Sequence, residues 1–229
     1  MFISSGYLIY LALILIIPIW AQMKVKGTYK KYSNVYNQSG MSGAQVARKI
    51  LDDNGLYDVR VEEVRGVLSD HYDPRSKVVR LSSSNYHEPS AAAQAVAAHE
   101  VGHAIQDEQE YAFLKFRSSL VPAASLGSNM SIFLILGGFL FQASGLVLAG
   151  IIFMSFAVLF QFVTLPVEFD ASNRAMDQLI STGIIRNDEE KQTKKVLDAA
   201  ALTYVAAALV ALLELLRFVL IFLNMNNDD

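Results

Sequence analysis

A long stretch without charge constrains this chain more than any other feature. No Asp, Glu, Lys or Arg occurs from Ser118 to Thr164. A helix that crosses the hydrocarbon core of a bilayer needs about 20 apolar residues, so the stretch is about twice as long as one crossing requires. Its least apolar point is Gln142–Gly145, where we expect the chain to reverse. We therefore predict two transmembrane helices, at residues 120–141 and 146–165, and expect Pro166 to end the second.

Two further apolar segments complete the predicted membrane region. Residues 3–21 lack the basic start and the small-residue cleavage site of a secretory signal, so we expect a retained helix, with Trp20 in the aromatic belt at its end. Residues 199–223 form the fourth predicted span. Within it Glu214 and Arg217 lie three residues apart and can neutralise each other. A composition of 53% hydrophobic and 18% charged residues is typical of a membrane protein.

The distribution of basic residues predicts how the chain crosses the membrane. Of the 19 Lys and Arg residues, 13 lie in residues 24–117, five lie in residues 168–198, and the last is Arg217. Four crossings put the polar sections 24–117 and 166–198 on one side of the bilayer, which the positive charge makes cytoplasmic, with both termini outside. The net charge of −3 gives no reason to expect nucleic-acid binding. The absence of Cys excludes disulfides and thiolate ligands.

The first polar section, residues 24–117, is expected to mix helix and strand. Gly40–Asn54 has the apolar spacing of an amphipathic helix. Val59–Val64 and Val78–Ser82 are predicted strands, and Asp70–Arg75 between them is predicted to be a turn because it contains Asp-Pro. We expect the second strand to have an open edge that can pair with an extended peptide substrate.

The most informative motif is His-Glu-x-x-His, within an alanine-rich helix predicted at residues 90–108. His99 and His103 are four residues apart, so both imidazoles leave the same helix face and can reach one zinc ion. Glu100 lies about 100° round the helix, where it can take a proton from a metal-bound water and hand it to a leaving amine. Gly102 is costly inside a helix, and close approach of another backbone or of the substrate would explain it.

A catalytic zinc site needs a third protein ligand besides the two histidines. Glu168 is the predicted one, because it is the first acid after the apolar hairpin and heads a helix-like segment. His71 and His87 are the alternatives. Asp170 and Arg174 lie four residues apart in the same segment. They can pair with each other, or Asp170 can orient a ligating histidine while Arg174 stabilises the substrate oxyanion.

Five stretches spread over most of the chain form a specific pattern. They are Ser39–Arg48, Asp70–Arg75, Val78–Ser82, Ala97–Gln106 and Leu165–Ala175. With these stretches the sequence resembles the small bacterial membrane-embedded neutral zinc metallopeptidases. The resemblance implies a zinc-dependent endopeptidase of the gluzincin type, with His99, His103 and Glu168 as zinc ligands and Glu100 as general base.

More distantly, the chain resembles the membrane proteases of the heat-shock and CAAX-processing kind. Those proteins carry Glu-x-x-Ala-Asp after the hairpin, whereas the matching residues here run Glu168-Phe-Asp-Ala-Ser172. Ser172 stands where that pattern has an orienting aspartate, and Asp170 is the residue that can substitute for it.

The predicted fold class is a mainly α integral membrane protein, with four transmembrane helices and a small cytoplasmic α+β zincin-like metalloprotease domain. We expect it to cleave a peptide or membrane-protein substrate at the lipid bilayer, and the resemblance implies a part in membrane-protein quality control or processing. The sequence does not choose the residue that stabilises the oxyanion. The candidates are His71, Tyr72, Tyr86, His87 and Arg174.

Two other classes of protein fit part of the sequence less well than a protease. A non-catalytic zinc-binding chaperone or scaffold would keep the metal for stability, but it has no need of Glu100 and normally closes the fourth metal position with protein. A transporter is favoured only by Glu214 and Arg217, and four helices without a clear inverted repeat argue against it.

Overall fold

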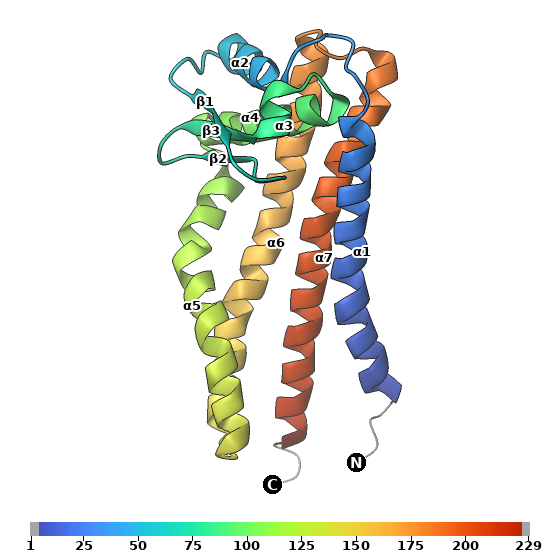
Figure 1. Ribbon diagram of the computed structural model, residues 1–229. Helices are drawn as coiled ribbons and strands as arrows, with labels where there is room; N and C mark the ends of the chain where they lie inside the picture. Colours follow the sequence, from blue (N-terminus) through green and yellow to red (C-terminus); the bar gives the residue numbers. More distant parts are fainter. Residues whose placement is uncertain (1–4, 226–229) are drawn as a thin grey trace. The chain divides into compact units, whose positions relative to one another are not determined.

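The computed structural model describes residues 5–225 of the chain, which is mainly helical and divides into two compact units. Among the described residues, unit 1 comprises residues 5–21, 115–166 and 203–225, and unit 2 comprises residues 22–114 and 167–202. The elements in chain order are α1 (Ser5–Ser33), α2 (Gly43–Asp53), β1 (Arg60–Val64), β2 (His71–Asp73), β3 (Val78–Ser82), α3 (Ser83–His87), α4 (Ala91–Glu108), α5 (Ala112–Leu140), α6 (Ser144–Ser181) and α7 (Asn187–Met225) (Figure 1).

Unit 1 consists of the apolar parts of the four long helices. Helices α1, α5, α6 and α7 are each long and apolar enough to cross a membrane, in agreement with the four predicted. Helices α5 and α6 pack closely, because a Cβ added to Gly127 of α5 would lie 2.3 Å from the carbonyl oxygen of Phe153 in α6. Small residues of this kind let helix backbones approach each other within a bilayer.

Polar side chains join α1 to α7 within unit 1. The expected pair is present, with Arg217 Nη1 3.7 Å from Glu214 Oε2. The same nitrogen donates a 3.2 Å hydrogen bond to the Tyr10 hydroxyl, and the guanidinium lies 5.6 Å from the centroid of the Tyr7 ring. Because α1 supplies two of these partners, the charge of Arg217 contributes to helix association.

Unit 2 is built on a three-stranded sheet with the order β1–β3–β2. Strand β3 pairs parallel with β1 and antiparallel with β2. The expectation that Val78–Ser82 has an open edge is therefore wrong, since β3 is central. The prediction that Asp70–Arg75 forms only a turn is also wrong, because His71–Asp73 forms β2. The Asp-Pro dipeptide stops the strand at Asp73 but does not prevent ladder pairing before it.

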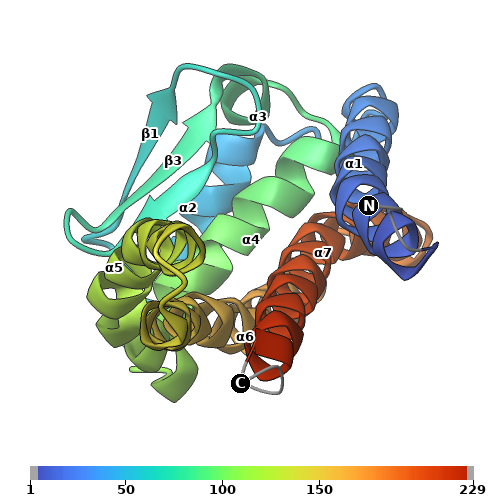
Figure 2. The same cartoon turned by 90° about the horizontal axis from the view of Figure 1, so that it is seen from below.

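Helices α2 and α4 cover one face of this sheet (Figure 2). Val79 and Leu81 of β3 and Ile50 of α2 are fully buried in the core between them. The start of α2 is fixed by a capping box, in which the Ser42 hydroxyl accepts from the Gln45 backbone N–H and the Gln45 side chain accepts from the Ser42 N–H. The sequence pattern thus gives α2 a defined start and an apolar face.

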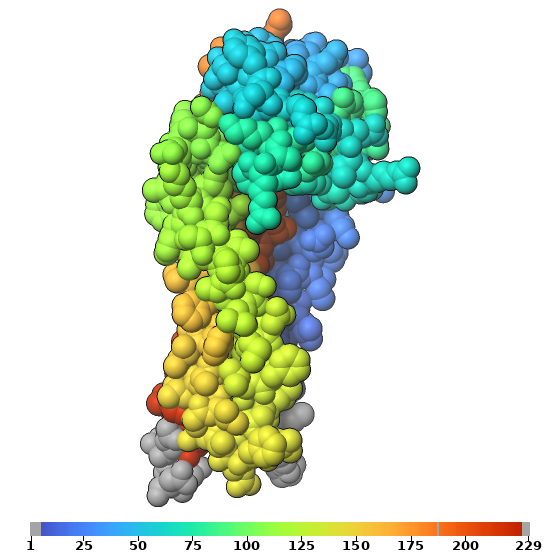
Figure 3. Space-filling model, turned by 90° about the vertical axis from the view of Figure 1, so that its left-hand side faces the viewer, coloured from blue at the N-terminus to red at the C-terminus, as the bar shows by residue number. Residues whose placement is uncertain are grey.

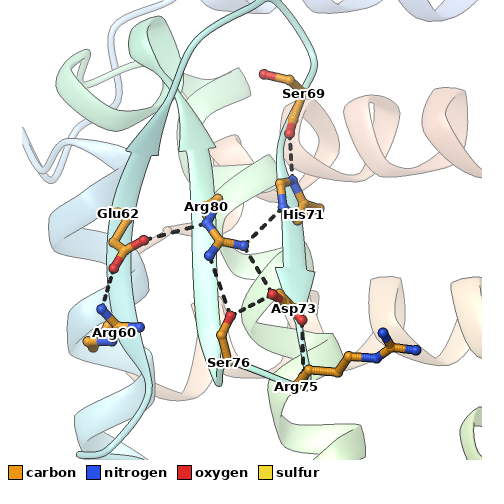
Figure 4. Close-up of polar contacts among 8 residues, drawn as sticks. All are labelled: Arg60, Glu62, Ser69, His71, Asp73, Arg75, Ser76 and Arg80. Carbon is orange, nitrogen blue, oxygen red and sulfur yellow. Dashed lines mark hydrogen bonds and ion pairs between the residues drawn. The ribbon is translucent and has the colours of Figure 1, made fainter.

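The other face of the sheet is charged (Figure 4). Arg80, on the central strand, lies 3.2 Å from Asp73 and 3.5 Å from Glu62. The Ser76 hydroxyl donates a 2.5 Å hydrogen bond to Asp73, and this bond, with the other donors around the carboxylate, lowers the pKa of Asp73 to about 2. Exposed pairs of this kind contribute little to stability, so this face is a solvated surface and not a second core.

Helix α6 does not end at Pro166, contrary to the prediction, but continues to Ser181. Its buried residues beyond the proline are Val167, Glu168, Ala171, Ala175 and Leu179. The apolar members repeat every four residues, so they form one stripe that packs into unit 2. Burial of that stripe outweighs the single backbone hydrogen bond that the proline removes.

Candidate metal centre

Helix α4 presents the two histidines of the motif. The helix starts at Ser90, whose hydroxyl accepts a 3.1 Å hydrogen bond from the Ala93 N–H. Most of its alanine-rich surface is buried, which fixes the helix in unit 2. The His99 and His103 rings lie edge to face with their centroids 4.8 Å apart. Both imidazoles are therefore held on one side of the helix, as their spacing predicts.

Glu168 reaches the two histidines from α6. Its Oε2 lies 3.3 Å from His99 Nε2 and 3.6 Å from His103 Nε2. One ligand atom from each of the three residues lies within 4.8 Å of the other two, and all three side chains are mostly buried. Two imidazoles and one carboxylate form a donor set found in catalytic zinc sites. This His–Glu group could hold a metal ion.

The approach of α6 to α4 depends on Gly102. A Cβ at this position would lie 2.6 Å from the carbonyl oxygen of Ala171, which is too close for any side chain against backbone. Ala171 is fully buried and lies three residues after Glu168. The glycine between the two histidines therefore allows the backbone of α6 to come close enough for Glu168 to contact them.

A buried glutamine fixes the tautomer of His103. Gln106 Nε2 donates to the Val167 carbonyl at 2.8 Å and to Asp170 Oδ2 at 2.7 Å. Because both of these partners are acceptors, the other amide atom, Oε1, must be the one that lies 3.0 Å from His103 Nδ1. His103 therefore carries a proton on Nδ1, and its Nε2 is the atom directed at Glu168.

This arrangement requires positive charge between His103 and Glu168. A neutral His103 would present the lone pair of Nε2 to a buried carboxylate oxygen 3.6 Å away, and two acceptors in that position repel each other. Burial opposes protonation, but the hydrogen bond to Glu168 and the nearby Glu100 together raise the pKa of His103. Without a metal, a proton on His103 Nε2 supplies this positive charge. A metal cation can supply the same charge, so the donor set fits a metal ion.

Glu100, which directly follows His99 in sequence, is also buried. Burial raises the pKa of its carboxyl group, although the neighbouring His99 and His103 oppose that shift. A carboxyl group with a raised pKa can take up and release a proton closer to neutral pH than an ordinary glutamate.

Ser172 and Asp170 act on different histidines. The Ser172 hydroxyl lies 3.3 Å from His99 Nδ1, so the residue that replaces the aspartate of the related pattern still contacts the imidazole. Asp170 does not substitute for it at His99. It reaches His103 instead, and only through Gln106.

Arg174 belongs to a network that extends from the His–Glu group toward the end of α4. Its Nε donates a 2.5 Å hydrogen bond to Asp170 Oδ2, so the predicted ion pair is present. Its Nη1 donates a 2.6 Å hydrogen bond to Gln109 Oε1, and the guanidinium lies 5.8 Å from the Tyr111 ring centroid. A role for Arg174 at a substrate oxyanion stays a prediction.

The other histidines lie outside the His–Glu group. His71 Nδ1 is 2.8 Å from a carbonyl oxygen of the preceding loop, and the ring contacts Arg80 on the charged sheet face (Figure 4). His87 Nε2 lies 3.1 Å from Glu63. The structure therefore brings neither alternative ligand to the site, nor does it bring His71 there as an oxyanion donor.

Gln106 is the site residue that sequence reasoning missed. Its position three residues after His103, on the same helix face, is the signal that could have found it. Gln106 is also fully buried. The sequence alone does not show this burial, because nothing marks an uncharged amide within an apolar helix as buried.

Comparison with known proteins agrees with this geometry. Residues 7–223 match the family described as "Putative neutral zinc metallopeptidase". The chain belongs to this family. It is also 55% identical over 210 residues to the Bacillus subtilis (strain 168) protein named "Putative membrane protease YugP", and the alignment covers 92% of this chain and 93% of that protein. No solved structure matches the chain.

Substitution of Gly102 tests how the His–Glu group is assembled. Gly102→Ala should displace α6 from α4, because the new Cβ would collide with the Ala171 carbonyl. We expect zinc affinity to fall at least tenfold, measured by competition with a chelating dye. Gly27→Ala is the matched control, since Gly27 is also helical and has nothing within 4 Å of an added Cβ. It should be neutral or slightly stabilising. Unchanged zinc affinity in Gly102→Ala would contradict the proposed packing.

Substitution of Gln106 tests the orientation of His103. Gln106→Leu removes the acceptor for His103 Nδ1, so we expect zinc affinity to fall about 10- to 100-fold, as for other groups that orient metal ligands. Gln94→Leu removes another fully buried amide from α4, whose Nε2 lies 3.5 Å from Thr193 Oγ1. It should leave zinc affinity unchanged. Equal losses in the two variants would mean that Gln106 acts only through general stability.

Proposed function

We propose that this protein is a membrane-bound zinc-dependent endopeptidase with His99, His103 and Glu168 as ligands and Glu100 as general base. The observation that carries the proposal is the convergence of ligand atoms of His99, His103 and Glu168 within 4.8 Å of one another. Helix α4, which supplies the two histidines, also carries the buried carboxylate of Glu100 next to His99. A structural zinc site has no use for that carboxylate. Membership of a zinc metallopeptidase family supports the same reaction.

The protein residues have separate tasks in this mechanism. Bound zinc would act as a Lewis acid toward the attacking water and the scissile carbonyl. Glu100 accepts the proton of the water and delivers it to the leaving amine, which a carboxyl group of raised pKa can do in both directions. Gln106 and Ser172 hold the imidazoles at Nδ1, so that both Nε2 atoms stay directed at the metal position.

Strand β2 is the proposed binding edge for the substrate. One edge of β2 pairs with β3, and its other edge has no strand partner among residues 5–225. Tyr72 of β2 donates a 2.8 Å hydrogen bond to Asp107, one turn after His103 on α4, which fixes the strand beside the metal helix. An extended segment of a peptide or membrane protein can add to that edge through its backbone.

We further propose that the site faces the cytoplasm and that both termini lie outside. The basis is the distribution of Lys and Arg, of which 13 lie in residues 24–117 and five in residues 168–198. The name of the Bacillus subtilis relative supports a membrane location. A role in membrane-protein quality control or processing follows from this location and from the proposed peptidase activity.

Cysteine labelling tests this topology, and the natural chain has no Cys to interfere. Tyr57→Cys in unit 2 and Phe141→Cys in the α5–α6 turn replace side chains that are 74% and 71% exposed. A membrane-impermeant maleimide should label Phe141→Cys in intact cells, but should label Tyr57→Cys only after permeabilisation. The reverse pattern would place the His–Glu group outside the cytoplasm.

The alternative function is a zinc-binding chaperone or scaffold without catalysis. It uses the same three ligands, so metal content does not separate it from a peptidase. Only the chemistry of Glu100 does, because a scaffold retains its function when this carboxylate is neutralised.

Glu100→Gln in the purified protein therefore decides between the two. Bound zinc should be the same as in wild type, while cleavage of an unfolded protein or membrane-protein substrate should fall by about 10²–10⁴, the usual contribution of a general base. Glu108→Gln, a change on the same helix at a 57% exposed side chain, should retain full activity. If every variant binds zinc but the wild type cleaves no protein in a broad substrate panel, the scaffold function is favoured. Cleavage that survives in Glu100→Gln would exclude its role as base.

A further inference from the structure

A pocket of about 800 Å³ lies in unit 2, outside the His–Glu group. It is lined by the last three turns of α1, by the loop between β1 and β2, and by the start of α3. We call it the α1 groove. The residues that matter for its chemistry are Gln22, Lys26, Lys30, Val67 and Leu68. Pockets of this size are large enough to hold a small organic ligand.

The α1 groove is positively charged. Lys26 and Lys30 are four residues apart and so lie on one face of α1. None of the lining residues is acidic, and within the described part of the chain neither ammonium group has an ion-pair partner. Other polar groups of the groove are already engaged, since the Tyr29 hydroxyl donates to Asn85 at 2.9 Å and the Ser33 hydroxyl donates to the Tyr29 carbonyl at 2.9 Å. The two lysines are therefore the groups that can meet an anion.

An apolar loop tip forms the other wall of the groove. Val67 is 75% exposed and Leu68 is 37% exposed, so neither has been taken into the core of unit 2. The loop has a defined shape, because Leu68 has a φ of 55° and the Ser69 hydroxyl donates a 3.1 Å hydrogen bond to the Arg65 carbonyl. In the space-filling view the segment that follows β1, coloured teal, projects from the surface (Figure 3). An exposed apolar tip of this kind can mark a contact surface, and lipid is one partner that can cover it.

The groove begins where the apolar part of α1 ends. Gln22 directly follows the apolar stretch of this membrane-length helix. At a rise of 1.5 Å per residue, Lys26 lies about 6 Å beyond Gln22, within the depth of a headgroup layer. Side chains on a helix point toward its N-terminus, so the ammonium group of Lys30 is directed back toward the same layer.

We propose that the α1 groove binds the headgroup of an anionic phospholipid. Lys26 and Lys30 contact the phosphate, and Val67 and Leu68 enter the boundary between headgroups and acyl chains. Four lysines within residues 24–31 follow the apolar stretch, and such a cluster at the end of a transmembrane helix attracts anionic lipid in general. The groove adds shape and an apolar contact on one side of the helix only. This site is independent of zinc and of peptide cleavage.

Lipid binding by the full-length, detergent-solubilised protein tests the proposal. Native mass spectrometry would count bound phosphatidylglycerol and phosphatidylcholine over a range of lipid concentrations. Lys26→Gln/Lys30→Gln should weaken phosphatidylglycerol binding about 10- to 30-fold, since each lysine near an anionic lipid surface contributes about fivefold. Lys24→Gln/Lys31→Gln is the matched control, because it removes the same charge from residues that line a different pocket. It should change binding less than threefold.

A second pair of variants separates a lipid from a small anion. Val67→Ser/Leu68→Asn should weaken phosphatidylglycerol binding, because it removes the apolar wall while Asn tolerates the backbone conformation at position 68. It should not change binding of inorganic phosphate. If both double-lysine variants weaken phosphatidylglycerol binding equally, the lysines act only by diffuse charge attraction and the proposed site is wrong. The proposal is also wrong if the wild type binds the two lipids with equal affinity, or if millimolar inorganic phosphate displaces phosphatidylglycerol.

Discussion

The close contact between α4 and α6 is the interaction on which the rest of the site depends. Two histidines on one helix supply only two ligand atoms, and the third of the group comes from Glu168 of α6. Gly102 removes the one Cβ that would hold the backbone of α6 away, with Ala171 directly against it. Burial of the apolar stripe of α6 then holds Glu168 against both imidazoles. The His–Glu group is thus a consequence of helix packing.

Hydrogen bonds behind the imidazoles add the orientation that packing alone does not give. Gln106 is connected at one end to His103 and at the other to α6 through Val167 and Asp170, so it joins the ligand to the neighbouring helix. Ser172 makes the corresponding contact to His99. An amide and a hydroxyl make these two contacts, so neither contact adds negative charge near the site. That suits a site in which Glu100 and Glu168 are already buried.

Much of this protein is determined by its sequence alone, because local patterns carry it. Charge-free length predicts membrane helices, and four-residue spacing predicts that His99 and His103 share a face. The strand predicted at residues 78–82 has the bounds of β3. The helix predicted at residues 90–108 differs from α4 by one residue. Each of these depends only on neighbours within one or two turns of the chain, where spacing and hydrophobicity are sufficient.

Tertiary structure alone decided the remainder. The central place of β3, the continuation of α6 through Pro166 and the pairing of Gln106 with Asp170 depend on contacts between residues far apart in sequence. Local rules fail here, because Asp-Pro predicts only a turn where β2 forms and Pro166 predicts a helix end where α6 continues. Burial energy from a distant segment exceeds the preference of a single residue. The sequence predicts which residues carry the chemistry of the site, and packing determines which other groups orient them.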